Sequence, residues 1–203
     1  MSWFGPRHPV LRSLSATLPG RLQRPDLLRD NFWVLDMEMD QLDARTGHIL
    51  SVAAYRLEGG GIDLERSIHL NLLQQQMHQQ AVHIHGIRPV DALNGVSEQE
   101  MLEKLIEGGQ NAWWVGHQPS LDAAFLAAAF KRHYGETYTI RFIDTLQLAL
   151  AADGYRFSRE GVKPTDYSLE ALCKRFRLPH PDPHTAAGDA YATALLLIRL
   201  MKG

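Results

Sequence analysis

The chain has 203 residues, of which 45% are hydrophobic and 22% are charged, and its formal net charge is −2. These values indicate one globular domain that is large enough to bury a core, and they exclude a disordered chain. The net charge gives no overall attraction to nucleic acid, although a local acidic site with bound cations can still accept a phosphodiester. A single cysteine, Cys173, excludes an internal disulfide and fits a reducing compartment. Since no apolar stretch is long enough to cross a bilayer, we expect a cytoplasmic protein with no membrane partner.

Residues 1–30 differ in composition from the rest of the chain. They have no acidic residue before Asp26, and their arginines are Arg7, Arg12, Arg21, Arg24 and Arg29. We interpret them as a basic N-terminal extension that precedes a domain at residues 31–203. Our preferred interpretation is a partly ordered segment packed on the domain surface. The alternatives are an organelle transit peptide and a basic arm that contacts nucleic acid or a partner such as a polymerase or an accessory protein.

The first half of the domain has the pattern of three consecutive strands. Residues 31–39 form an apolar run that is typical of a buried strand, and residues 47–57 and 65–73 are predicted to form the next two. The short connection at residues 40–46 and the glycines at 59–61 are typical of hairpin turns. These strands are therefore expected to be antiparallel neighbours.

The second half of the domain alternates helices and strands. Ser97 and Glu100 have the spacing of a capping box, which predicts a helix that ends near Glu107. The other predicted elements are strands at 112–116 and 140–143 and helices at 120–133, 145–152, 168–177 and 185–202. Together with the first three strands, they predict an α/β fold with a mixed five-stranded sheet flanked by helices.

Four carboxylates and one histidine lie at the ends of these predicted elements. Asp36 and Glu38 end the first strand, Asp122 begins a helix, and His184 and Asp189 lie at the start of the last helix. Buried acidic groups are costly unless they are paired or bind a cation. Since strand side chains alternate between faces, Asp36 and Glu38 point the same way. Carboxylates that converge at one sheet edge can hold two Mg²⁺ or Mn²⁺ ions for phosphoryl chemistry. Taken singly, each residue also has a plain explanation, such as Asp122 complementing a helix dipole.

The spacing of His184 and Asp189 limits how the two can meet. Five residues along a regular helix place two side chains about 140° apart around its axis. They converge only if His184 precedes the helix, as the prolines within residues 179–183 indicate. A histidine at a helix N-terminus is biased toward its neutral form, which suits a general base. The alternative is a plain cap-region histidine, with Asp189 as a buried hydrogen-bond partner.

These residues resemble, in order and placement, the three motifs of the DnaQ-like DEDDh 3′–5′ exonucleases of the ribonuclease H-like superfamily. The first motif is Asp36-Met37-Glu38, the second is the segment Gly116–Leu126 that contains Asp122, and the third is His184-x-Ala186-x-x-Asp189. The resemblance runs from about Phe32 to Leu200. Three positions depart from the usual family residues: Met39, Gln118 and Leu121.

The resemblance implies a ribonuclease H-like fold and stepwise release of nucleoside 5′-monophosphates from a 3′ end. It implies that Asp36, Glu38 and Asp189 bind a first divalent ion, that Asp36 bridges to a second, and that Asp122 assists through water. His184 would be the general base. The backbone at Met37, Glu38 and Met39 and the segment His85, Gly86 and Ile87 would hold the terminal nucleotide. The departures at positions 39, 118 and 121 bear on how that nucleotide is gripped.

Three functions are compatible with these residues. The first is a 3′–5′ exonuclease on DNA that is single-stranded or has frayed ends, and the second is an exoribonuclease or oligoribonuclease with the same chemistry. Discrimination between them rests on how the pocket treats the 2′-hydroxyl, which no motif reveals. The third is a non-catalytic accessory module that binds nucleic acid or a polymerase. The complete set of four carboxylates and a histidine argues against this third function.

Other histidines form weaker candidate sites. His78, His83 and His85 lie close together, but no cysteine accompanies them, so a structural zinc ion is disfavoured. His180 and His184 would share a face on a helix, but the prolines between residues 179 and 183 make a helix there improbable.

Overall fold

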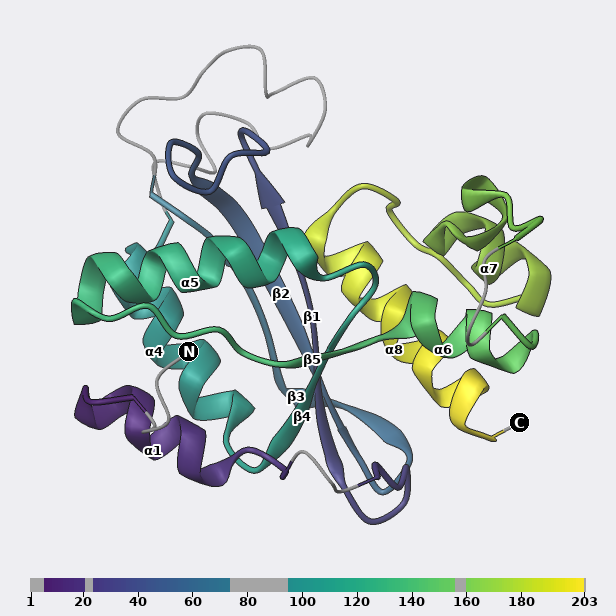
Figure 1. The fold of residues 1–203 in the computed structure, drawn as a ribbon, viewed down its shortest axis with the longest axis horizontal. Coiled ribbons are helices and arrows are strands. Elements are labelled where there is room, and N and C mark those ends of the chain that lie inside the picture. Colours follow the sequence, from purple (N-terminus) through teal and green to yellow (C-terminus); the bar gives the residue numbers. More distant parts are fainter. Residues whose placement is uncertain (1–5, 21–23, 74–94, 156–159, 203) are drawn as a thin grey trace.

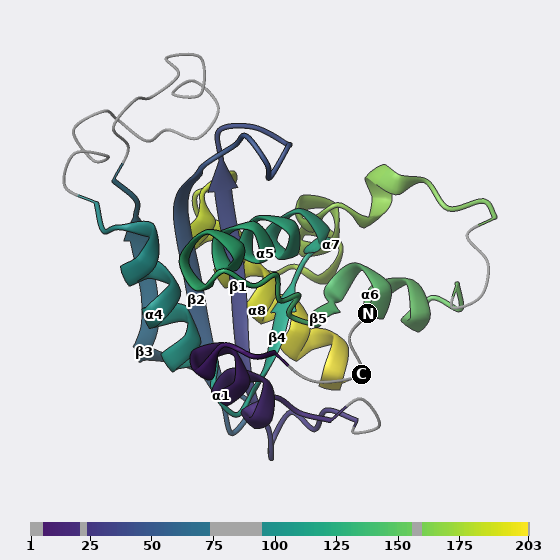
Figure 2. The ribbon, with the colours of Figure 1, turned by 60° about the vertical axis from the view of Figure 1, so that its left-hand side comes forward.

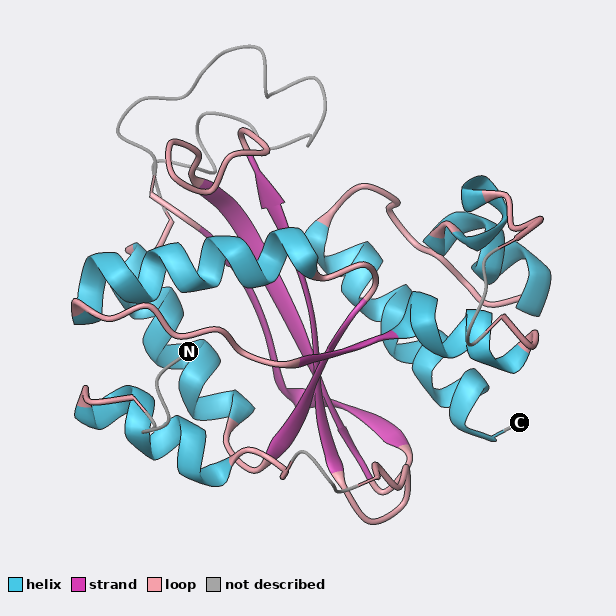
Figure 3. Ribbon diagram, in the orientation of Figure 1, coloured by secondary structure: helices cyan, strands magenta, loops and turns pink. Residues whose placement is uncertain are grey.

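The computed structural model describes residues 6–20, 24–73, 95–155 and 160–202, and its centre is a mixed five-stranded sheet (Figures 1 and 3). The strands lie in the order β3-β2-β1-β4-β5. Their bounds are Asn31–Met39 for β1, Ile49–Glu58 for β2, Gly61–Asn71 for β3, Ala112–Gly116 for β4 and Phe142–Asp144 for β5. The predicted α/β fold with a five-stranded mixed sheet is confirmed.

Strand β1 is the middle strand and has a different neighbour on each side. It pairs antiparallel with β2, where Phe32 lies opposite Leu57, and parallel with β4. Strands β2 and β3 form the predicted hairpin, and Gly59 and Gly60 adopt left-handed φ values of 58° and 80°. Two consecutive left-handed residues suit the right-handed twist of a hairpin, which explains the glycines at this turn.

The two faces of the sheet carry separate helix layers (Figure 2). Odd-numbered residues of β1, from Trp33 to Met39, join a large core with residues of helices α1, α4 and α5. The even-numbered Phe32 and Val34 pack on the other face against Ala194 and Leu197 of helix α8. Because Asp36 and Glu38 continue this even-numbered row, strand alternation places them on the α8 face.

In the described part of the chain, six α-helices and one 3-10 helix accompany the sheet. Their bounds are Pro9–Thr17 for α1, Glu98–Gly109 for α4, Ser120–Tyr134 for α5, Thr145–Ala152 for α6, Pro164–Tyr167 for the 3-10 helix η1, Leu169–Phe176 for α7, Ala186–Lys202 for α8. Helices α6, α7 and α8 share a small apolar cluster with η1 beside the main sheet. Among the described residues, no helix combines the length and apolar character that a membrane span requires.

Helix α1 is an element that the sequence pattern does not predict. Its Leu11 and Leu14 are fully buried in the large core, so residues 9–17 contribute to the same core as the sheet. At the N-terminal end, Glu136 accepts hydrogen bonds from the backbone N–H groups of Arg7 and His8 at 2.7 and 2.9 Å. The five arginines of residues 1–30 give this segment a basic, polar composition, so composition alone predicts a surface extension and not a helix with two buried leucines.

Candidate active site

Strand β1 brings the first two carboxylates to the α8 face of the sheet. Asp36, Glu38 and Asp189 each offer a carboxylate oxygen, and these oxygens lie within 4.8 Å of one another. The β1–β2 register shifts between Glu38 and Met39, which marks an irregularity where β1 leaves the sheet. Bulges of this kind are frequent next to functional sites because they redirect side chains.

Helix α5 brings Asp122 to the same place from the end of β4. The turn between them is fixed by His117, whose Nε2 donates to the carbonyl of Tyr167 at 3.1 Å, while Nδ1 lies 2.9 Å from the hydroxyl of Thr145. The backbone N–H of Gln118 donates to Asp144 at 2.9 Å. Asp122 is buried, and its Oδ1 has no hydrogen-bond partner among the described residues.

The loop from α7 to α8 brings the last residues of the set. His184 lies in a turn before α8, as the prolines around it predict. Its backbone has a left-handed φ of 63°, and its side chain is exposed. Its backbone N–H lies 3.3 Å from Oδ1 of Asp189. A histidine before the helix and an aspartate in its first turn can therefore face the same site.

Gly188 is what allows this loop to close on the first turn of α8. A Cβ at this position would lie 2.1 Å from the carbonyl oxygen of Pro181 and 2.3 Å from that of Asp182, which no side chain tolerates. The Thr185 hydroxyl donates to Asp182 O at 2.7 Å and accepts from the Gly188 N–H at 3.1 Å. The glycine between Ala187 and Asp189 is a sequence signal for this close approach.

Burial, with repulsion between neighbouring carboxylates, raises the pKa values of three acidic residues of the site. Burial raises the pKa of Asp36 well above its usual value, and the charges of Asp122, Asp189 and Glu38 raise it further. Burial, followed by the charge of Asp189, raises the pKa of Glu38 to about 7, whereas His184 lowers it. Burial also raises the pKa of Asp122 to about 7, against backbone hydrogen bonds from Asp122 and Met37 that lower it. Carboxylates arranged in this way are suited to bind cations.

The other predicted site residues lie in different surroundings. The side chains of Met37 and Met39 are buried in the large core, on the face of β1 opposite the carboxylates, so only their backbone can face the site. His85, Gly86 and Ile87 lie outside the described residues, as do His78 and His83. Leu121 packs against the large core.

Sequence reasoning missed one residue that touches the set directly. His180 lies before α8, and its Nε2 is 2.6 Å from Oδ1 of Asp189. The prolines correctly argue against a helix at residues 179–183, but the folded loop brings the ring back to Asp189. A histidine four residues before the third motif was the available signal.

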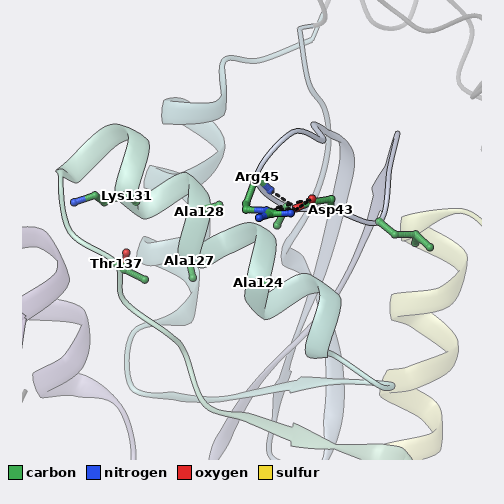
Figure 4. Close-up of a pocket in the computed structure, with 9 residues that line it drawn as sticks. Asp43, Arg45, Ala124, Ala127, Ala128, Lys131 and Thr137 are labelled. Atoms are coloured by element: carbon green, nitrogen blue, oxygen red, sulfur yellow. Dashed lines mark hydrogen bonds and ion pairs between the residues drawn. The ribbon is translucent and has the colours of Figure 1, made fainter. Parts of the chain in front are cut away.

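An open hollow of about 710 Å³ lies between the β1–β2 connection and the outer face of α5 (Figure 4). Its lining is mainly apolar, with an ion pair between Asp43 and Arg45 on one wall and alanines 124, 127 and 128 on the other. Neither Asp36 nor Asp122 lines it. Each wall belongs to a segment that also holds a site carboxylate: the β1–β2 connection follows Asp36 and Glu38 of β1, and Asp122 lies in the first turn of α5.

Comparison with known proteins identifies the family. The model of the RNase_T exonuclease family matches residues 33–197, a span that contains all five residues of the set. The chain belongs to this exonuclease family. The fold and the relatives described below are those of DnaQ-like exonucleases, which confirms the resemblance drawn from the motifs.

Relatives with curated descriptions come from bacterial replication. The chain is 26% identical over 179 residues to DNA polymerase III subunit epsilon of Aquifex aeolicus, which covers 88% of this chain and 84% of the relative. It is 26% identical over 176 residues to DNA polymerase III PolC-type of Bacillus cereus, which covers 87% of this chain and 12% of that protein. The chain therefore spans about an eighth of the PolC-type proteins that it matches.

A solved structure with a similar fold is E. coli exonuclease I in complex with a dT13 oligonucleotide. The TM-score is 0.69 at 20% sequence identity, and the match covers 84% of this chain and 41% of exonuclease I. Family membership and the acidic cluster together identify a nuclease whose site is built to use divalent metal.

Proposed function

We propose that this protein is a metal-dependent 3′–5′ exonuclease that hydrolyses phosphodiester bonds at single-stranded or frayed 3′ ends of DNA and releases nucleoside 5′-monophosphates. The observation that carries the proposal is the convergence of Asp36, Glu38 and Asp189, whose carboxylate oxygens lie within 4.8 Å of one another. These residues come from two segments, β1 and the start of α8, and all three lie within the span that the family model matches. The polymerase III relatives and the oligonucleotide complex of exonuclease I support DNA as the substrate.

The donor set fits divalent metal. Oxygen-only ligands suit Mg²⁺ or Mn²⁺, and the buried Oδ1 of Asp122 lacks a partner among the described residues. Asp36, Glu38 and Asp189 would hold one ion, and Asp36 would also bridge to a second with assistance from Asp122. When bound, two such ions activate the attacking water and stabilise the leaving oxygen.

His184 is the proposed general base. Its exposed position in the turn before α8 leaves the ring open to a water near the carboxylates, and its interaction with Glu38, whose pKa it lowers, supports a position close to them. Taking a proton from the attacking water would contribute about 10²–10⁴-fold to the rate. Asp189 anchors the backbone of His184 through Oδ1, so the base and the ligand are held by one short segment.

The terminal nucleotide would be held by backbone at Met37, Glu38 and Met39 and by the segment His85–Ile87. The irregular register at Glu38 and Met39 supports the first of these contacts, because it turns backbone groups away from regular pairing with β2. Polymerase relatives also support a replication partner for residues 1–30. Since Leu11 and Leu14 are buried, such a partner would contact the exposed side of α1.

The test incubates the protein with 5′-labelled single-stranded DNA or RNA in Mg²⁺, Mn²⁺ or EDTA. A ladder that shortens progressively from the 3′ end is expected on DNA with either metal, and none in EDTA. Asp36→Asn and His184→Ala should lose the ladder, whereas Glu136→Gln, a carboxylate change outside the site, should keep it. Immediate release of a labelled mononucleotide would contradict the 3′–5′ polarity. Faster degradation of RNA would contradict the DNA assignment, and no cleavage of either strand would contradict the enzyme itself.

A further inference from the structure

Two histidines in the α7–α8 loop meet Asp189 in different ways. The His180 ring is nearly buried, with 11% of its side chain exposed, and its Nε2 lies 2.6 Å from Oδ1 of Asp189. The ring of His184 is exposed, and only its backbone N–H approaches the same oxygen, at 3.3 Å. One loop therefore presents a ring that is fixed on the carboxylate and a ring that is open to substrate.

The chemistry of this contact sets its direction. An ionised carboxylate only accepts hydrogen bonds, so Nε2 of His180 donates to Asp189. With a ring N–H and a backbone N–H both directed at Oδ1, the rotation of the carboxylate is fixed, and so is the direction of Oδ2. Hydrogen bonds to a metal-ligating carboxylate orient it and tune its affinity for the ion.

We propose that His180 is a positioning residue, which orients Asp189 for divalent metal through the Nε2–H donor and leaves His184 free to act as the base. This inference rests on the proposed metal-dependent function. It divides the work of the loop between two histidines that lie four residues apart, of which only His184 belongs to the family motif.

The surrounding loop is built to keep His180 in place. The backbone at Pro181 and Asp182 passes so close to Gly188 that no Cβ fits between them. The Thr185 hydroxyl ties Asp182 to the first turn of α8. The backbone that directly follows His180 is thus held against the first turn of α8, and the ring itself is held by Asp189.

The test measures Mn²⁺ binding to the full chain by isothermal titration calorimetry, without nucleic acid. His180→Ala should weaken binding by about 10–100-fold, the usual effect of losing a hydrogen bond to a metal ligand. His180→Gln keeps an N–H donor at a similar distance from the backbone and should stay within about threefold of the unchanged protein. Exonuclease activity should follow the same order at limiting Mn²⁺.

A matched control is His133, whose Nε2 lies 2.8 Å from Glu98 on the surface between α4 and α5. His133→Ala removes a contact of the same type and should leave Mn²⁺ binding unchanged. If His180→Ala binds Mn²⁺ as tightly as the unchanged protein, or if His180→Gln is as weak as His180→Ala, the positioning role is wrong. If circular dichroism shows that His180→Ala is unfolded, the Gln variant decides the test. Mn²⁺ binding by His180→Gln within about threefold of the unchanged protein supports the positioning role, and binding weakened by about 10-fold or more contradicts it. Absence of Mn²⁺ binding by the unchanged protein would overturn the proposed metal site, and this inference with it.

Discussion

The carboxylate of Glu136 and the carboxylates at the end of β1 meet opposite surroundings. Glu136 accepts two backbone N–H groups of the N-terminal segment, mainly that of His8, and these hydrogen bonds lower the pKa of Glu136. Asp122 is buried and Asp36 and Glu38 are partly buried beside it, and the pKa values of all three are raised. The carboxylate of Glu136 is paired within the protein, whereas the carboxylates at the end of β1 repel one another and could hold a metal ion.

This difference separates residues that stabilise the fold from residues that serve the reaction. A carboxylate whose pKa is raised by burial destabilises the metal-free folded state when it ionises. The site carboxylates therefore lower the stability of the metal-free folded state, whereas other regions raise it, for example the fully buried leucines of α1. Substitutions in the two regions should therefore change the stability of the metal-free protein in opposite directions.

The largest effect is expected for Asp36→Asn. Loss of Asp36, the proposed bridging ligand, would remove several kcal/mol of transition-state stabilisation, so kcat/KM on labelled DNA should fall by about 10³-fold or more. The same change removes repulsion with Asp122, Asp189 and Glu38, so the metal-free variant should unfold at a higher temperature than the unchanged protein. A variant that loses stability in EDTA would contradict the repulsion argument, whatever its activity.

Leu14→Ala tests the opposite region. Leu14 is fully buried in the large core, so the free energy of unfolding should fall by about 2–5 kcal/mol in urea titrations. Val10 is partly exposed on the same helix, and Val10→Ala is the control, with little change expected. Equal stability of Leu14→Ala and the unchanged protein would show that α1 does not belong to the core.

The pH dependence of stability gives an intermediate effect. The folded-state pKa values of Glu38 and Asp122 are about 7, above the unfolded values of 4.5 and 3.8. The folded state therefore holds more protons between these limits, and its stability in EDTA should fall as pH rises from about 4.5 to about 7. Saturating Mn²⁺ should reduce this fall, since the bound ion favours the ionised carboxylates.

Thermal unfolding at pH 5 and pH 7.5, with and without Mn²⁺, measures this effect. Because histidines also titrate in this range, Asp122→Asn serves as the matched variant, and its curve should be flatter than that of the unchanged protein in EDTA. Identical pH dependence of the two proteins would contradict the raised pKa of Asp122.

Glu136→Gln should give the smallest effect. The variant keeps an acceptor oxygen but loses the charge that faces the N–H groups of Arg7 and His8, so a small decrease in Tm is expected. Exonuclease activity should not change. A rise in Tm would mean that this carboxylate behaves like those of the site, and the contrast between the two regions would fail.

Strand β1 and the motif positions could be predicted from sequence because their signals are local. An apolar run with acids at its end predicts both the strand and the shared face of Asp36 and Glu38. The edge strand β3 was harder: its predicted start at residue 65 lies later than the observed start at Gly61, because polar side chains there hide the strand pattern. Helix α1 was missed for the same reason, since arginines surround the buried Leu11 and Leu14.

Loop geometry could not be predicted, because it depends on contacts between distant segments. Nothing local in the sequence places His180 on Asp189; the backbone packing around Gly188 does so. Gln118 adopts a left-handed φ of 55° at the turn before α5. Asparagine tolerates that conformation better than glutamine, which gives a physical reason for the usual family residue at this position.

The most direct test of the metal site is a crystal of the unchanged protein soaked in Mn²⁺, with anomalous differences measured at the manganese edge. We expect a peak about 2.0–2.6 Å from carboxylate oxygens of Asp36, Glu38 and Asp189, with a second peak on the Asp36 and Asp122 side. Absence of any peak at these oxygens, with Mn²⁺ bound elsewhere, would contradict it.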